Sequence, residues 1–205
     1  MQKIRSLDDL RRFIAWDLRS SSKSCSVRSL ITDPVLRFTL VLRFNEYLLN
    51  NKINIIARLI PLLYFRRLSI RLGFSIPFNV FGEGLAIVHY GTIIVNPAAS
   101  IGRNCRIHAV VNIGGSSRLA SPDGAEHSAP TIGDNVYIGP GAKIYGPITI
   151  ANGCVIGANA VVGRTFAEKN KTIAGVPAKV VASRGSDGML IDGGEVSIER
   201  RRVEN

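Results

Sequence analysis

The residue best suited to acid–base chemistry is His89, in the segment Val88-His89-Tyr90-Gly91. Imidazole titrates near neutral pH, so a positioned histidine can take a proton from a hydroxyl group. An aliphatic residue recurs every six positions further along the chain, and extending that rhythm back from Val95 puts position 89 in an aliphatic slot. We therefore expect His89 to be either a buried histidine satisfied by the backbone or a general base.

Two other histidines lie where they could assist. His108 follows Ile107 at a predicted corner, 19 residues and so about one coil from His89. A plain turn residue is the simpler interpretation of His108. His127 lies in an irregular segment rich in Ser, Asp, Gly and Pro. The three cysteines form no CxxC pair, and two of them occupy small-residue positions of the repeat, so we expect buried small side chains and no metal site.

A six-residue rhythm must position these side chains. The aliphatic positions fall in two phased blocks: Val95, Ile101, Ile107, Ile113, then Ile132, Ile138, Ile144, Ile150, Ile156 and Val162. Glycine usually follows each aliphatic residue, and a small residue usually comes four positions after it. This period indicates a parallel β-helix in which three hexads close a coil and residue n stacks on n+18. We expect the glycines to occupy corners with positive φ.

The rest of the chain divides around this unit. Residues 1–78 have helical patterns: a helix over 1–20, one from the Asp33-Pro34 cap to about Leu49, and one from about Asn54 to Leu72 that is kinked or broken at Pro61. Residues 79–182 form the β-helix, interrupted by a loop at 115–130 where we expect function. Residues 183–205 are polar and predict a flexible tail.

The net charge of +11 is uneven, because residues 1–80 hold 14 Lys/Arg and 5 Asp/Glu. The sequence contains no motif typical of a nucleic-acid-binding module, so we do not expect nucleic acid as a partner. The first twenty residues carry charges throughout, unlike a signal peptide, so we expect a cytoplasmic protein. The basic helix near residues 54–72 either lies on an anionic membrane on its cytoplasmic face or packs against the β-helix with a solvated basic face.

Three segments together carry a family resemblance: His89-Tyr90-Gly91 in the first coil, the turn Asn112–Gly115, and the closing Ala174-Gly-Val-Pro-Ala-Lys179. With the hexads, they resemble the serine acetyltransferase group of hexapeptide-repeat acyltransferases. The resemblance covers about residues 73–182. It implies a left-handed β-helix and assembly as a homotrimer or a dimer of trimers.

The resemblance also implies a reaction. His89 would deprotonate an acceptor hydroxyl, which attacks the thioester of acetyl-CoA directly, with no metal, no covalent enzyme intermediate and no permanently bound cofactor. The same resemblance places Gly115, Pro140 and Ala158 beside the pantetheine of acetyl-CoA and Lys179 near its phosphates. His127 lies near the position of a substrate-loop histidine of the family, offset by one residue. His127, Glu83 and His108 are the candidate acceptor or base-orienting contacts, and Glu83 is the carboxylate nearest to His89 in sequence.

Two departures from the family leave the acceptor open. Val88 stands where the family has an Asp, and Phe74 aligns with a second family carboxylate. The family default is acetylation of L-serine to O-acetylserine in cysteine biosynthesis. Loss of both carboxylates favours the alternative, a sugar O-acetyltransferase that modifies capsule or exopolysaccharide. A third hypothesis is a non-catalytic β-helix scaffold.

Overall fold

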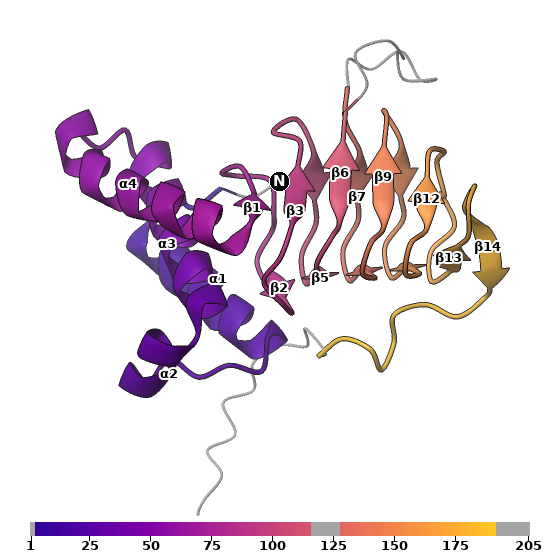
Figure 1. Cartoon of the computed structure of the whole chain (residues 1–205), viewed down its shortest axis with the longest axis horizontal. Helices are drawn as coiled ribbons and strands as arrows, with labels where there is room; N and C mark the ends of the chain where they lie inside the picture. Colours follow the sequence, from indigo (N-terminus) through magenta and orange to yellow (C-terminus); the bar gives the residue numbers. More distant parts are fainter. Residues whose placement is uncertain (1–2, 116–127, 192–205) are drawn as a thin grey trace, which may run out of the picture.

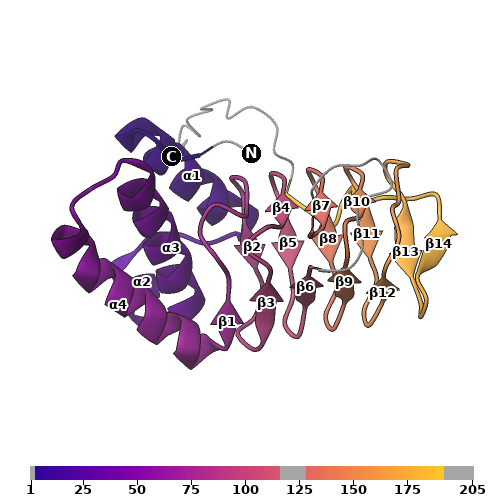
Figure 2. The same ribbon diagram turned by 90° about the horizontal axis from the view of Figure 1, so that it is seen from above.

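Four helices precede a three-sided β-helix (Figure 1), in a computed structural model that describes residues 3–115 and 128–191. The helices stand at the foot of the β-helix, and its coils stack away from them (Figures 1 and 2). The left-handed parallel β-helix predicted from the sequence is confirmed. Within the described residues, no helix is both long and apolar enough to span a membrane.

The helices begin at residues that cap them. They are α1 (Leu7–Ser20), α2 (Val27–Thr32), α3 (Pro34–Asn50) and α4 (Ile55–Leu72). Ser6 and Asp9 form a capping box at the start of α1, and Asp33 caps α3 with Pro34 in its first turn. Helix α2 was not predicted, because a capping box of two serines, Ser26 and Ser29, starts it inside a Ser-rich segment. Helix α4 is one helix that contains Pro61, so of the two predicted alternatives, a kink or a break at Pro61, the break is wrong.

Three sheets form the faces of the prism. Sheet A contains β1 (Phe74–Ser75), β3 (Ile93–Val95), β6 (Asn112–Gly114), β9 (Lys143–Tyr145) and β12 (Val161–Val162). Sheet B contains β4 (Ser100–Ile101), β7 (Thr131–Ile132) and β10 (Thr149–Ile150). Sheet C contains β2 (Ala86–Ile87), β5 (Arg106–Ile107), β8 (Tyr137–Ile138), β11 (Val155–Ile156), β13 (Thr172–Ala174) and β14 (Lys179–Ala182). Figure 2 shows sheet C as a row. All pairings are parallel except that of β13 with β14.

The n+18 rule holds where Val95 pairs with Ile113, Ile132 with Ile150 and Ile138 with Ile156. Two other pairings reveal insertions. Ile113 pairs with Ile144, so residues 115–130 enlarge the corner between sheets A and B rather than replace a coil. In the first coil Ile87 pairs with Ile107, 20 residues away, so two extra residues enlarge the corner that follows Ile87.

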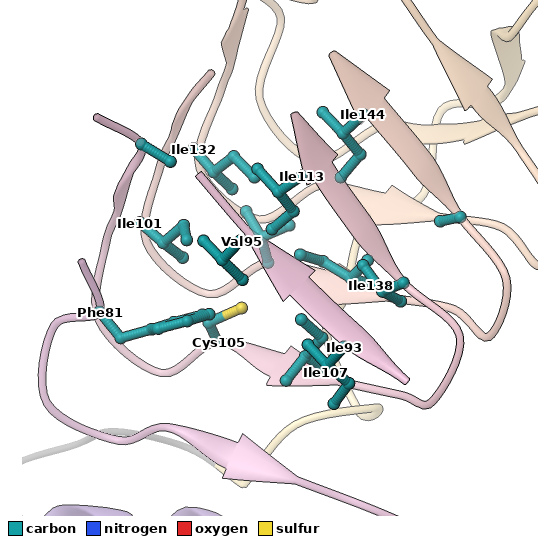
Figure 3. Packing of buried hydrophobic residues seen from close by; sticks show 14 of the residues in the cluster. Phe81, Ile93, Val95, Ile101, Cys105, Ile107, Ile113, Ile132, Ile138 and Ile144 are labelled. Atoms are coloured by element: carbon teal, nitrogen blue, oxygen red, sulfur yellow. The ribbon is translucent and has the colours of Figure 1, made fainter. Parts of the chain in front are cut away.

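The interior of the prism is a stack of aliphatic side chains (Figure 3). The predicted aliphatic positions are at most 3% exposed, and Cys105 and Cys154 are buried among them as expected. Burial raises the pKa of the Cys105 thiol to about 12. Phe81 lies at the lowest coil and is 2% exposed, so it closes the foot of the core against the helical region.

The prediction that the glycines after the aliphatic residues have positive φ is wrong. Positive φ occurs three positions after the aliphatic residue, at Asn104, Asn135 and Asn159, and not at the glycine that follows it directly. Gly102 has no positive φ; a Cβ there would lie 2.7 Å from the backbone carbon of Gly133 in the next coil. Glycine is required at that position because successive coils approach too closely for a side chain.

A buried ion cluster joins the helices to the first coil. Arg43 of α3 is 0% exposed and donates to the Asp17 carboxylate at 2.7 Å and to Glu46 at 3.0 Å. Its guanidinium also donates to the carbonyl oxygens of Phe81 and Gly82. Burial opposes the charged form, but the two carboxylates raise the pKa of Arg43 above its ordinary value. The cluster fixes α1 and α3 against the coil that carries His89.

The segment after β14 differs from the flexible tail predicted from residue 183. It turns back along the β-helix towards the helices (Figure 1) and packs on the corner between sheets B and C. Ser186 donates to the carbonyl oxygens of Gly153 and Asn135, and Asn104 donates to that of Ile191. Residues 192–205 lie outside the described part of the chain.

Candidate active site

The corner between sheets C and A, which we name the C–A edge, gathers most of the residues singled out in the sequence. Its turns follow the sheet C strands, and the register stacks them in the order 88–91, 108–110, 139–141, 157–159 and 174–176. His89, His108, Pro140 and Ala158 therefore lie on one line, one from each of the first four coils.

His89 is exposed in the enlarged turn between β2 and β3. The prediction that position 89 is a core slot is wrong, because Ile87 fills that slot and is 2% exposed. The two extra residues in this turn shift the hexad count and place the imidazole outside the prism. An accessible imidazole can meet a substrate, whereas the buried alternative could not.

His108 lies one coil above His89, and the two rings have centroids 6.2 Å apart. On its other side His108 packs against the Tyr137 ring at 5.0 Å. Its Nε2 is buried, with no hydrogen-bond partner among the described residues. Burial lowers the pKa of His108, and the charges of Arg106 and His89 act in the same direction. His108 is thus a neutral neighbour of His89 near pH 7.

Three of the residues predicted to contact acetyl-CoA lie on this edge. Pro140 and Ala158 are exposed in adjacent coils, and the Asn159 amide donates to the Pro140 carbonyl. Lys179, also exposed, pairs with Ala174 at the end of β13, in the uppermost coil. Sheet C has five strand spacings from β2 to β14, so at ~4.8 Å per spacing His89 and Lys179 are separated by ~24 Å along the edge. An extended ligand following the edge would span a base at one end and a cation at the other.

The other predicted residues lie elsewhere. Gly115 follows β6 at the corner between sheets A and B, close to Asn96 and Ser128, so it is at the far end of sheet A from the C–A edge. His127 lies outside the described residues. Glu83 precedes β2 while His89 follows it, so sheet C separates them. The Glu83 carboxylate accepts from Arg12 of α1 at 2.9 Å instead of orienting His89.

Carboxylates are segregated from the histidines. In the described β-helix, residues 74–115 and 128–182, the carboxylates are Glu83, Asp134 and Glu168, and all follow sheet B at the B–C corner. Phe74, which was predicted by count to align with a family carboxylate, is 5% exposed and packs edge-on against Phe38 at 4.9 Å. No carboxylate of the described β-helix therefore lies on the C–A edge.

A polar cavity of about 310 Å³ occupies the B–C corner beneath the returning C-terminal segment. Glu83, Asp134 and Ser186 are among its lining residues. It is on the opposite side of sheet C from His89. On the C–A edge, by contrast, the four residues His89, Pro140, Ala158 and Lys179 are all exposed in the single chain.

Sequence reasoning missed two features of the C–A edge. Val110 has φ of 65°, an uncommon conformation for a β-branched residue, and it lies two residues after His108. The Lys143 ammonium donates to the Val110 carbonyl at 2.7 Å and fixes this turn. Tyr137 packs on His108. The outward slots of sheets A and C hold Lys143 and Tyr137, and the hexad rule constrains only the inward slots.

Comparisons with known proteins agree with this architecture. Residues 129–164 match the family model for the bacterial transferase hexapeptide (six repeats). Serine acetyltransferase of Mycobacterium tuberculosis is 37% identical over 105 residues, which are 51% of this chain and 43% of that protein. The enzyme of Staphylococcus epidermidis is 34% identical over 140 residues, 67% of this chain and 61% of that protein. The chain thus spans about half the length of such curated relatives.

Solved structures extend the likeness to the helical region. The crystal structure of serine acetyltransferase from Brucella abortus has a TM-score of 0.63 and 25% identity, covering 87% of this chain and 71% of that one. Soybean serine acetyltransferase complexed with serine has a TM-score of 0.65 and 26% identity, covering 84% and 69%. Both the helices and the β-helix therefore have counterparts in these proteins.

Proposed function

We propose that this chain, which belongs to the hexapeptide-repeat acyltransferases related to serine acetyltransferase, is an acetyl-CoA-dependent O-acetyltransferase. One observation carries the proposal. An exposed histidine, His89, stands at the foot of an edge on which Pro140, Ala158 and Lys179 follow in successive coils. These are the positions that the family resemblance assigns to the base and to acetyl-CoA.

In the proposed reaction His89 accepts the proton of an acceptor hydroxyl as that oxygen attacks the thioester carbonyl. The tetrahedral intermediate collapses, the C–S bond breaks, and CoA leaves as a thiolate that recovers a proton from the imidazolium. The neutral state of His108 suits this step, because a second cation 6.2 Å away would oppose the charge that His89 gains. Lys179 would neutralise phosphate charge on the donor.

We also propose that a second copy supplies another wall of the site. Acetyl-CoA on these exposed residues would remain largely hydrated, whereas ligand sites bury most of the ligand surface. A homotrimer with C–A edges at its interfaces would enclose the donor between neighbouring prisms. Gly115, on another corner, would then approach the His89 of the adjacent copy.

The first candidate acceptor is L-serine, because the relatives at 34–37% identity are serine acetyltransferases. A specific observation favours a second candidate, a sugar hydroxyl. The ammonium group of serine requires a carboxylate or several acceptors when it leaves water. The described part of the C–A edge offers no carboxylate, and Phe74 and Val88 occupy the two positions where the family has one. A neutral sugar needs no such partner.

The decisive experiment measures CoA release from acetyl-CoA with L-serine and, separately, with nucleotide sugars and oligosaccharides. Cys25 is exposed and would react with a thiol reagent, so the assay uses a Cys25→Ser background. Turnover with serine alone selects the first candidate, and turnover with a sugar alone selects the second. If no acceptor raises CoA release above hydrolysis while the protein is folded, the transferase proposal is wrong and the scaffold hypothesis gains.

A further inference from the structure

Helix α4 presents a large apolar surface to solvent. It packs inward through Phe65, whose ring stacks on Phe38 at 5.3 Å, and through the buried Leu68 and Leu72. Its outer side carries seven large hydrophobic residues that are 43% to 78% exposed: Ile55, Ile56, Leu59, Ile60, Leu63, Tyr64 and Ile70. Figures 1 and 2 both show α4 along the outside of the helical region. A patch of this kind marks an interaction surface.

The exposed side of α4 has an ordered pattern. Ile56, Leu63 and Ile70 are seven residues apart, so they form one row along the helix. Arg66 and Arg67 come three and four residues after Leu63, so they flank this row on its two sides. Arg71 follows Arg67 on the same flank. A central apolar row with cations on both sides is the pattern of a helix that lies in a membrane interface.

The charge of α4 is not neutralised by the protein. The helix contains Arg58, Arg66, Arg67 and Arg71 and no Asp or Glu. None of these arginines forms an ion pair with a described residue, whereas all five carboxylates of residues 3–80 pair with cations on or beside α1 and α3. The partner of this face must therefore supply both an apolar interior and negative charge.

These observations decide between two occupants. In a two-fold dimer through α4, the arginines of one copy would face those of the other with no acid from either helix, which is unfavourable. An anionic bilayer provides phosphates for the arginines and acyl chains for the apolar row. A helix of 18 residues is about 27 Å long, enough to lie flat with the row immersed. We infer that α4 is a peripheral docking surface for anionic lipid membranes.

The test is flotation of the full chain with lipid vesicles. The protein should float with vesicles of phosphatidylglycerol and phosphatidylcholine, float poorly with phosphatidylcholine alone, and dissociate at high salt. The variant Arg66→Gln/Arg67→Gln/Arg71→Gln should lower the partition coefficient by on the order of 100-fold at low ionic strength. Ile60→Ser/Leu63→Ser leaves the net charge unchanged and should also weaken binding by removing the inserted side chains.

A matched control removes three exposed cations away from α4, two from the β-helix and one from the segment after β14, Arg164→Gln/Lys169→Gln/Arg184→Gln, and should float like the unmodified chain. Thermal melting verifies that every variant is folded. Equal losses in the control and the α4 variants would overturn the inference, since binding would then follow net charge alone. Binding that survives both α4 variants would also overturn it. So would failure to float combined with self-association that is lost in Ile60→Ser/Leu63→Ser, which would make the face a contact between copies.

Discussion

The rings of His89 and His108 face each other across consecutive coils, with centroids 6.2 Å apart and planes inclined by 58°. This relationship depends on two extra residues in the turn after Ile87, which carry His89 outside the prism while His108 stays half-buried against Tyr137. The pair thus combines an accessible imidazole with one whose pKa is lowered. The exposed His89 is suited to proton transfer, and the neutral His108 adds no positive charge beside it.

Replacement of His89 tests its role as the base. His89→Ala should lower kcat by roughly 10²–10⁴-fold, the usual contribution of a positioned general base, without changing the melting temperature. The side chain is exposed, so its loss leaves no cavity. Steady-state CoA release with the true acceptor measures the effect. Lys169→Gln, an exposed change on another corner, should retain full activity; an equally active His89→Ala would remove the residue from the mechanism.

Lys179 should act on donor binding rather than on chemistry. Lys179→Gln removes a cation at the upper end of the C–A edge, where the phosphates of acetyl-CoA are expected. We expect KM for acetyl-CoA to rise by about fivefold to tenfold and kcat to stay the same, because the contact is equal in the ground and transition states. Kinetics at varied acetyl-CoA measure both constants. A fall in kcat at unchanged KM would contradict this placement.

His108 should make folding stability depend on pH in the weakly acidic range. Its pKa is lowered in the folded protein by burial and by the charges of Arg106 and His89. Stability from the neutral ring is therefore fully present above the unfolded value, about 6.5, and is lost as the pH falls towards the folded pKa. His108→Gln should flatten the decrease of melting temperature below pH 6.5. Identical pH profiles of the two proteins would show that His108 protonates freely in the fold.

Arg43 should be the most sensitive ionic position in the helical region. Arg43→Met leaves the buried carboxylates of Asp17 and Glu46 without a counter-charge, and we expect a loss of about 3–5 kcal/mol in the free energy of unfolding. Guanidinium chloride denaturation measures it. Arg11→Met, which breaks an ion pair on the protein surface with Asp8, serves as the control and should leave the midpoint unchanged. Similar losses of unfolding free energy in both variants would show that the buried cluster contributes no more to stability than an ion pair on the surface.

Much of the fold was predictable because every coil of the prism places the same kind of side chain at the same inward position. The inward slots need aliphatic side chains at a fixed spacing, so Ile132, Ile138 and Ile144 disclose the coils without any tertiary information. Corners are less constrained. The hexad count does not register the two residues added after Ile87, so the environment of His89 was predicted incorrectly, and its role as the base stays a prediction.

The candidate site was only partly predictable for a related reason. Residues that follow the strands of one sheet meet on one edge, so His108 could be placed about one coil from His89 by counting, whereas Pro140 and Ala158 were expected near the donor only from the family resemblance. Outward side chains obey no period, and neither the packing of Tyr137 on His108 nor the contact of Lys143 with Val110 leaves a signal in the repeat. The pairing of Glu83 with Arg12 needed the position of α1, which local patterns do not encode.

Two opposite substitutions separate the requirement for space from the requirement for positive φ. Gly102 has ordinary φ but faces the backbone of Gly133 in the next coil, so Gly102→Ala should push the coils apart and cost about 1–3 kcal/mol. Val110 has φ of 65° and is 54% exposed, so Val110→Gly removes an unfavourable backbone conformation and little packing, and it should be neutral or stabilising by up to about 1 kcal/mol. Chemical denaturation of both variants compares the two effects. If Gly102→Ala leaves the free energy of unfolding unchanged, the spacing of the coils does not require glycine after the aliphatic residue. If Val110→Gly is destabilising, the side chain of Val110 stabilises its turn despite the positive φ.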